Sequence, residues 1–458
     1  MAVVAPQAPA AERTAPVQTD RFRYWQRRTI VSTIAGYALY YFVRKNFSLA
    51  MPGMESELGI TKVNLGLFLT LNGLIYGLSR FANGFIADRV SGRVFMVIGL
   101  TLCALVNFAF GFSADAAALI SGQMSGREFT SVLIMVMGLL WVLNGWLQGM
   151  GVPPCTHLLT HWIPPRELAT KMSVWNMSHS IGAGLVVILC GYIMGNFGAG
   201  AWRFCFWIPA AIATVGAAGL WFALRDTPSS VGLPELSNTA TKPGAAPERT
   251  EQFKAFIRRK VFGNRLIWTL AIANFFVYVV RFSVLDWGPS LLKQSKGVSL
   301  QHAGWMVAMF EIAGIAGMLL AGWVTDRFFA SRAHRTCVFC MLGAATAVVA
   351  FWQLPATAPA WLTAATLCAA GFFIYGPQAL LGIAACNHAT NRAAATANGL
   401  LGLFGYSSTI LSGLGLGYVA QHYGWEQAYL AIVLVAVLGM LVLLTMWNAQ
   451  AAGYDEDQ

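Results

Sequence analysis

Twelve windows of about twenty apolar residues recur along the chain, and they limit its possible folds more than any other feature. A helix needs about 20 apolar residues to cross a bilayer, whereas a strand of a membrane barrel needs only about 9–11 alternating ones. The windows cover residues 29–50, 65–87, 94–113, 131–154, 172–195, 203–224, 265–288, 302–325, 335–354, 360–385, 394–420 and 426–448. Their length predicts an all-α membrane protein with twelve transmembrane helices.

The composition supports a membrane protein and explains the basic charge. The chain is 57% hydrophobic and 11% charged, whereas a soluble domain has roughly 25% charged residues. Of the 30 Lys and Arg residues, 21 lie in the N-terminal tail and the even-numbered connections, five in the other connections and four inside predicted helices. Loops that face the cytoplasm carry this kind of excess. The distribution predicts two cytoplasmic termini, and no nucleic-acid partner for the net charge of +11.

Segments outside the windows have a different composition. The first twenty residues are rich in Ala and Pro without an apolar core, which predicts a disordered tail and no signal peptide. The basic residues 258–260 of the linker can lie against lipid headgroups. The predicted organisation is a cytoplasmic tail (1–28), a six-helix bundle (29–224), a cytoplasmic linker (225–264), a second six-helix bundle (265–448) and a cytoplasmic tail (449–458). All eight Cys lie in or beside predicted helices, so we expect no disulfide framework, no metal site and no cofactor.

Two motifs recur at nearly the same spacing in both halves. Arg44 precedes Gly84-x-x-x-Asp88-Arg89 by 40 residues, and Arg281 precedes Gly322-x-x-x-Asp326-Arg327 by 41. Internal repeats are typical of transporter folds, whose substrate site lies near the membrane midplane between the repeats. The spacing predicts two pseudo-symmetric bundles around a central cavity. The Asp88–Arg89 and Asp326–Arg327 loops are predicted to be conformational latches, not binding residues.

Ionisable residues inside the predicted helices indicate where that site lies. Each costs about 2.5–3.5 kcal/mol to insert, so the default interpretation is a functional residue that faces a cavity. The cations are Arg44, Lys45, Arg80 and Arg281, and the acids are Asp286 and Glu311. Because buried charges need partners, pairing both acids leaves two cations over.

Side-chain chemistry and depth in the membrane indicate that the two cations without an acidic partner are Arg44 and Arg281. The planar guanidinium of Arg44 and of Arg281 matches phosphate oxygens better than a lysine ammonium does. Each lies about 15 residues, or about 22 Å, from the cytoplasmic end of its predicted helix. A phosphate monoester carries about −1.5 to −2 charges at neutral pH, which fits the surplus. Lys45 with Asp286, and less securely Arg80 with Glu311, are predicted salt bridges between the halves.

Further polar side chains could complete a phosphate site. His179 lies about two turns from the cytoplasmic end of its helix and could donate to the phosphate or share its proton. Candidate hydroxyl donors are Tyr37, Tyr41, Tyr76, Tyr278, Tyr375 and Tyr406.

Plainer interpretations stay open for each candidate. Arg44 could snorkel to the outer interface, and Arg80 could snorkel toward Asp88. His179 could be a core histidine bonded to a neighbouring carbonyl. Most of the tyrosines could be packing residues or members of an interfacial belt.

Several motifs together resemble those of a known family. The repeated Gly-x-x-x-Asp-Arg loop is similar to that of major facilitator superfamily transporters. The family signals, which resemble the organophosphate:phosphate antiporters, are residues 36–45, 149–155, 175–179, 281–287 and 375–377. They cover both halves of the chain.

The resemblance implies site residues that agree with the tally of charges. It implies that Arg44 and Arg281 bind the phosphoryl group, that His179 contacts it, and that Lys45–Asp286 and Arg80–Glu311 bridge the halves. One departure is Arg80, where similar proteins carry Lys.

Within the family, residues 272–274 and 402–406 resemble glycerol-3-phosphate antiporters. Similar hexose-phosphate exchangers can carry an acid and a Lys at the positions of Asn398 and Leu401, which favours a small organic moiety here. We therefore predict a monomeric antiporter that exchanges inorganic phosphate for an organophosphate, glycerol 3-phosphate first, by rocker-switch alternating access. The alternatives are a hexose-phosphate or phosphoglycerate transporter and a sugar-phosphate-sensing receptor. An enzyme is not expected.

Overall fold

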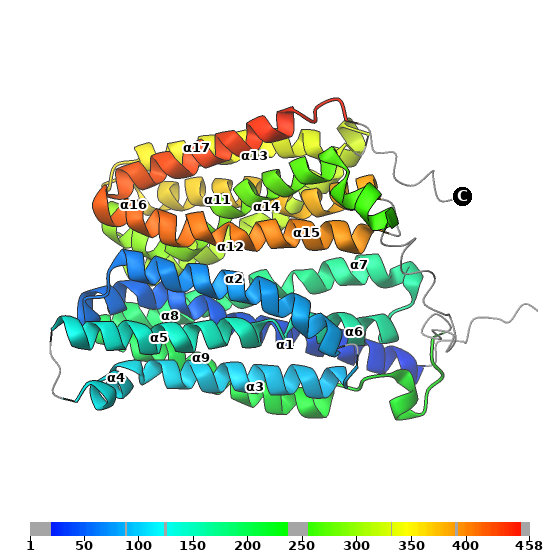
Figure 1. Cartoon of the computed structure of the whole chain (residues 1–458), viewed down its shortest axis with the longest axis horizontal. Helices are drawn as coiled ribbons and strands as arrows, with labels where there is room; N and C mark the ends of the chain where they lie inside the picture. The colour runs from blue at the N-terminus through cyan, green and yellow to red at the C-terminus, as the bar shows by residue number, and fades with distance from the viewer. Residues whose placement is uncertain are drawn as a thin grey trace, which may run out of the picture.

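The helices form two layers that correspond to the two halves of the sequence (Figure 1). The computed structural model describes residues 20–87, 89–122, 126–236, 255–330, 332–389 and 393–449. The N-terminal half contains α1 (Asp20–Leu58), α2 (Lys62–Ala87), α3 (Gly92–Gly111), α4 (Ser113–Ser121), α5 (Arg127–Gln148), α6 (Val152–Trp162), α7 (Pro165–Asn176), α8 (Ser178–Phe197), η1 (Ala199–Arg203) and α9 (Phe204–Ala223), followed by η2 (Pro228–Val231). The C-terminal half contains η3 (Arg258–Phe262), α11 (Arg265–Lys296), α12 (Leu300–Phe328), α13 (Ala333–Gln353), α14 (Ala360–Ala389), α15 (Ala394–Ser407), η4 (Ile410–Gly415), α16 (Leu416–His422) and α17 (Trp425–Leu444).

These elements make twelve passes along the bundle. Within the described ranges, eleven passes are long and apolar enough to cross a membrane. The twelfth is α1, which runs the length of the bundle (Figure 1) and contains Arg44 and Lys45. The predicted twelve transmembrane helices in two six-helix bundles are thus confirmed. We call the end where α1 begins the Asp20 end and the opposite end, where α2 begins, the Lys62 end.

The first helix is longer than the sequence predicts. Residues 20–28, expected in the disordered tail, form the first turns of α1. They are held because the Trp25 ring stacks on Trp162 at 6.4 Å and Arg28 donates to the carbonyl of Ala223 at 3.0 Å. Asp88, the rest of that tail (1–19), the middle of the linker (237–254) and residues 450–458 lie outside the described residues.

The two halves contact each other closely toward the Lys62 end. The Thr70 hydroxyl of α2 donates to the carbonyl of Thr409 at 2.6 Å. A Cβ added at Gly66 would lie 2.4 Å from the carbonyl oxygen of Gly413, and one added at Gly304 would lie 2.4 Å from that of Val187. We call these two contacts the glycine seam. Backbone therefore meets backbone here, with no room for a side chain.

We expect Gly66→Leu to destabilise this closed end by about 1–3 kcal/mol, because overpacking forces neighbouring backbone to move. Thermal unfolding in detergent measures the effect as a lower melting temperature. Gly219→Leu on α9 is the matched control, since nothing lies within 4 Å of a Cβ added there. Equal melting temperatures for the two variants would contradict the tight seam.

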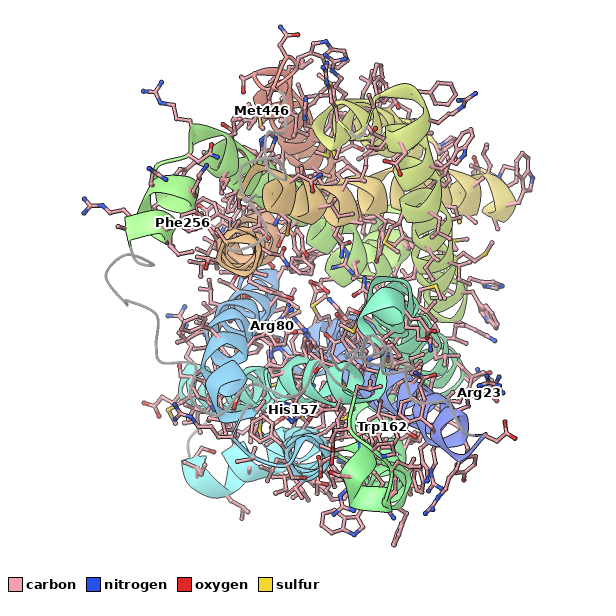
Figure 2. The ribbon with its side chains drawn as sticks, turned by 90° about the vertical axis from the view of Figure 1, so that its right-hand side faces the viewer. Arg23, Arg80, His157, Trp162, Phe256 and Met446 are labelled. Atoms are coloured by element: carbon pink, nitrogen blue, oxygen red, sulfur yellow. The ribbon has the colours of Figure 1, made fainter. Side chains whose placement is uncertain are left out.

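At the Asp20 end, the boundary between the two halves contains Arg80. Figure 2 looks onto this end and places Arg80 of α2 at the boundary between the two halves. Its side chain is exposed although it lies inside a membrane-spanning helix. Its electrostatic neighbours include Tyr406 and Tyr278 of the opposite half. Arg80 therefore lies exposed at the boundary between the two halves.

Candidate functional site

Helix α1 brings two cations into the centre of the bundle at a bend. Val43 departs from helical geometry, with φ −99° and ψ 21°. Arg44 and Lys45 follow directly and are 9% and 7% exposed. The bend therefore lies at the point where the chain presents its buried charges.

The Arg44 guanidinium lies against aromatic rings. Its central carbon is 3.9 Å from the centroid of the Tyr76 ring and 5.7 Å from that of Tyr41. Cation–π contacts of this kind stabilise a cation without using its hydrogen-bond donors. Within the part of the chain that the structure describes, Arg44 forms no ion pair.

Arg281 of α11 occupies the corresponding place in the C-terminal half. It is 4% exposed and donates through Nη2 to the Tyr375 hydroxyl at 3.1 Å. Its Nε is buried and has no hydrogen-bond partner among the described residues. Like Arg44, it forms no ion pair within the described ranges.

Two side chains link the arginine sites of the two halves. Tyr41 interacts electrostatically with both Arg44 and Arg281, and so does His179. The rings of Tyr41 and His179 are 5.8 Å apart. The structure thus brings the two arginines and the histidine into one site, as their pattern in the sequence suggests.

His179 has one nitrogen bound and one without a partner. Nδ1 donates to the carbonyl of Asn176, as expected of a core histidine. Since a carbonyl only accepts, Nδ1 carries the hydrogen. Nε2 is buried without a hydrogen-bond partner in the described part of the chain. It can accept a proton from a ligand or, once protonated, donate to one.

The six candidate tyrosines form a continuous aromatic wall around the arginines. Tyr41 and Tyr76 contact Arg44, while Tyr278 and Tyr375 contact Arg281, each within 6.0 Å of its guanidinium. Tyr37 packs edge-on against Tyr41 at 5.5 Å, and Tyr406 packs edge-on against Tyr76 at 4.8 Å across the two halves. The Tyr76 hydroxyl is buried beside the hydroxyls of Tyr37 and Tyr406. The wall can therefore supply both cation–π contacts and hydroxyl donors.

Lys45 and Asp286 form a buried ion pair between α1 and α11. Their side chains are 9% and 10% exposed. The Lys45 ammonium also lies 5.2 Å from the centroid of the Phe282 ring. This pair joins the two halves at the depth of the arginines.

The second predicted bridge, Arg80 to Glu311, is not formed in this structure. Neither residue has an ion pair within the described ranges. Glu311 is fully buried, and its electrostatic neighbours are Arg281 and the Tyr375 hydroxyl. The reason is depth. Arg80 precedes its loop motif by four residues and Glu311 precedes the equivalent motif by 11, which separates them by about 10 Å along the helices.

The loop residues predicted to be latches lie apart from this site. Arg89 follows the end of α2, and Asp326 and Arg327 lie in the last turn of α12, all exposed at the Asp20 end. Their predicted latch role stays a prediction. The described residues contain no group of three His, Cys, Asp or Glu that could hold a metal ion.

Sequence reasoning missed a group of buried amides beside the bend. Asn107, Asn144 and Gln148 all donate to the carbonyl of Val43. The available signal was the presence of carboxamides inside apolar windows, where polar side chains commonly join helices.

Both the sequence and the fold are similar to those of known transporters. The family model described as "Major Facilitator Superfamily" matches residues 33–413. Among solved structures, the fold is similar to a bacterial homologue of the human lysosomal transporter Spinster in an inward-facing, unoccupied conformation, with a TM-score of 0.72. That similarity covers 93% of this chain and 97% of the other at 17% identity, so it shows the fold alone.

Relatives with much higher identity span nearly the whole chain. A probable hexose phosphate transport protein of Chlamydia pneumoniae is 35% identical and covers 94% of this chain and 93% of its own length. The glycerol-3-phosphate transporter of Bacillus subtilis is 35% identical over 96% of this chain and 97% of its own. The membrane sensor protein UhpC of Escherichia coli is 33% identical over 96% and 98%. This multi-pass membrane protein, which is not an enzyme, belongs to the major facilitator superfamily and, within it, to the organophosphate:phosphate antiporter family.

Proposed function

We propose that this protein is an antiporter that exchanges inorganic phosphate for an organophosphate, glycerol 3-phosphate first. The observation that carries the proposal is one buried arginine from each half, Arg44 and Arg281, with no ion pair to either in the described ranges. A doubly charged anion placed between them neutralises both and connects the halves.

The surplus charge also explains why transport should be an exchange. With the site empty, Arg44 and Arg281 repel each other when the halves close around them, and Glu311 beside Arg281 offsets part of this repulsion. A bound dianion replaces this repulsion with charge-assisted hydrogen bonds, which are the strong ones. Only the loaded site then favours the rocking step, so each crossing carries a phosphate group.

The other residues of the site would act on the same ligand. Arg281 Nε and His179 Nε2 lack hydrogen-bond partners among the described residues. A phosphate oxygen can accept from Arg281 Nε, and His179 can take or return the proton of the phosphate. We propose that Lys45–Asp286 is the gate that must break when the Lys62 end opens.

The organic half of the substrate is small on this proposal. The relatives include a glycerol-3-phosphate transporter and a probable hexose phosphate transport protein of equal identity, so identity does not choose between them. Asn398 is neutral and exposed, while Leu401 is 2% exposed and belongs to the hydrophobic core. Neither supplies a charge for a larger polar ligand.

We further propose that the Asp20 end faces the cytoplasm of a bacterial inner membrane, with both termini on that side. Arg21, Arg23 and Arg27 lie at this end, as the bias of basic residues toward the cytoplasm requires. In the described conformation Arg44, Arg281 and His179 are buried between the halves. All residues of the site come from one chain, so we propose a functional monomer.

A sensor is the second candidate, because a 33% identical relative is named a membrane sensor protein. A sensor can keep the same phosphate site without completing the transport cycle. Counterflow is the property that separates the two candidates.

The test is exchange in proteoliposomes loaded with inorganic phosphate. We expect labelled phosphate to enter only in exchange, with strongest competition from glycerol 3-phosphate, followed by phosphoglycerates and hexose phosphates. Protein-free liposomes are the control. Binding without counterflow would favour the sensor, and strongest competition by a hexose phosphate would overturn the choice of substrate.

A further inference from the structure

The bend of α1 at Val43 is held by three side-chain amides from two other helices. The carbonyl of Val43 accepts from Asn107 Nδ2 of α3 at 2.8 Å. It also accepts from Asn144 Nδ2 at 3.1 Å and from Gln148 Nε2 at 3.3 Å, both on α5. We call Asn107, Asn144 and Gln148 the amide clamp.

The clamp is fully enclosed by protein. Asn107 and Asn144 are 0% exposed and Gln148 is 2% exposed. Burying an amide without hydrogen bonds costs at least about 1–3 kcal/mol, and the clamp avoids this cost through further contacts. Gln148 also donates to the carbonyl of Tyr40 at 3.1 Å, and Asn107 accepts from Asn46 Nδ2 at 2.9 Å. A buried polar network whose hydrogen bonds are all satisfied makes the core rigid and favours one arrangement of the helices.

The position of the clamp is what connects it to function. A bend exposes backbone groups that a straight helix would pair internally, and in a membrane-spanning helix neighbouring side chains must pair them instead. The clamp does so at Val43, one residue before Arg44 and two before Lys45. The direction in which both side chains leave α1 therefore depends on where the clamp holds this carbonyl.

We infer that the amide clamp is a positioning device that orients Arg44 toward the phosphate site by fixing the bend at Val43. This inference rests on the proposed function, since it concerns how Arg44 meets a phosphate. The clamp residues act through the backbone of α1 and do not contact the ligand. Removing a clamp donor releases the bend, and Arg44 then meets the phosphate in a wrong orientation even though its charge is intact.

The test compares phosphate affinity with the maximal exchange rate. In Asn107→Leu, we expect the half-saturating concentration of phosphate to rise by about 10- to 100-fold, as for a displaced positioning contact, while the amount of inserted protein stays normal. Asn107→Gln, which keeps an amide donor, should recover most of the affinity. Gln148→Met has nearly the same shape without the donor. It should raise the half-saturating concentration of phosphate by a smaller factor than Asn107→Leu does. It also provides the test if Asn107→Leu does not fold.

A matched control removes a buried asparagine that donates to α5 and not to the Val43 carbonyl of α1. Asn72 is 6% exposed and donates to the carbonyl of Trp141 at 2.9 Å, so Asn72→Leu removes a similar bond but keeps all three clamp donors. Its phosphate affinity should match the wild type. An unchanged affinity in Asn107→Leu and Gln148→Met, or an equal loss in Asn72→Leu, would overturn the clamp while leaving phosphate exchange by the wild type intact. A wild-type protein that neither exchanges nor binds phosphate would overturn the proposed function, and the clamp's role with it.

Discussion

Arg281→Lys is expected to reduce phosphate exchange by about 30- to 5,000-fold while the protein still inserts in the membrane. Truncating one partner of a buried charge pair costs about 2–5 kcal/mol, and each 1.4 kcal/mol is tenfold. Lysine keeps the positive charge but loses the planar fork that meets two phosphate oxygens at once. The guanidinium of Arg281 can donate to the Tyr375 hydroxyl from one nitrogen and to the ligand from the others, whereas a lysine has a single nitrogen for both contacts. Arg44→Lys should show a loss of the same order, because Arg44 occupies the equivalent place in the other half.

The experiment measures labelled phosphate exchange in proteoliposomes for each variant against equal amounts of inserted protein. Arg335→Lys is the matched control. Arg335 lies in the same half as Arg281, on α13, and donates to the carbonyl of Trp447 at 2.9 Å, away from the site. Wild-type exchange in Arg281→Lys or Arg44→Lys would show that the phosphate is bound elsewhere and would end the proposed mechanism.

Asp286→Asn should produce the second large effect. It leaves the Lys45 ammonium buried without its carboxylate, and breaking a buried pair in this way costs about 3–5 kcal/mol. Because the pair joins α1 to α11, the loss falls on the conformation that is closed toward the Lys62 end. We expect lower thermal stability in detergent and a strong loss of exchange, since the population moves to conformations open at that end.

A double variant shows whether the instability of Asp286→Asn comes from the unpaired charge of Lys45. Lys45→Met with Asp286→Leu removes both charges, and an apolar pair of similar volume often restores stability. The melting temperature should therefore recover relative to Asp286→Asn, although exchange need not. Asp115→Asn is the control, because the Arg203 and Asp115 side chains are 25% and 56% exposed and ion pairs near the surface contribute about 0–1 kcal/mol. A melting temperature for Asp286→Asn equal to that of Asp115→Asn would contradict a stabilising bridge.

The sequence was sufficient to predict the fold because helical hydrophobicity and basic loops are local signals. The spacing from Arg44 to its loop motif and from Arg281 to its own revealed two similar halves without any contact information. Chemistry and depth then selected the arginines, and the structure places both beside Tyr41 and His179. Their role in binding phosphate stays a prediction.

Other features depended on tertiary contacts that no local pattern contains. Glu311 lies by Arg281 and not by Arg80, because α11 and α12 belong to the same half and meet at the same depth. Residues 20–28 look like a polar tail, but they form a helix because aromatic and arginine contacts hold them on the bundle. The bend at Val43 has no proline or glycine to announce it. It exists because amides on two other helices supply its hydrogen bonds.

The glycine seam has a consequence for how easily the two halves can part. When interlocking side chains meet, each loses rotamer freedom that costs up to about 2 kcal/mol, and regains it on separation. Gly66 and Gly304 meet carbonyl oxygens with no side chain to order, so the contact can form and dissolve with little change in side-chain entropy. A closure held in this way leaves the choice between the two openings to the charges at the centre of the bundle.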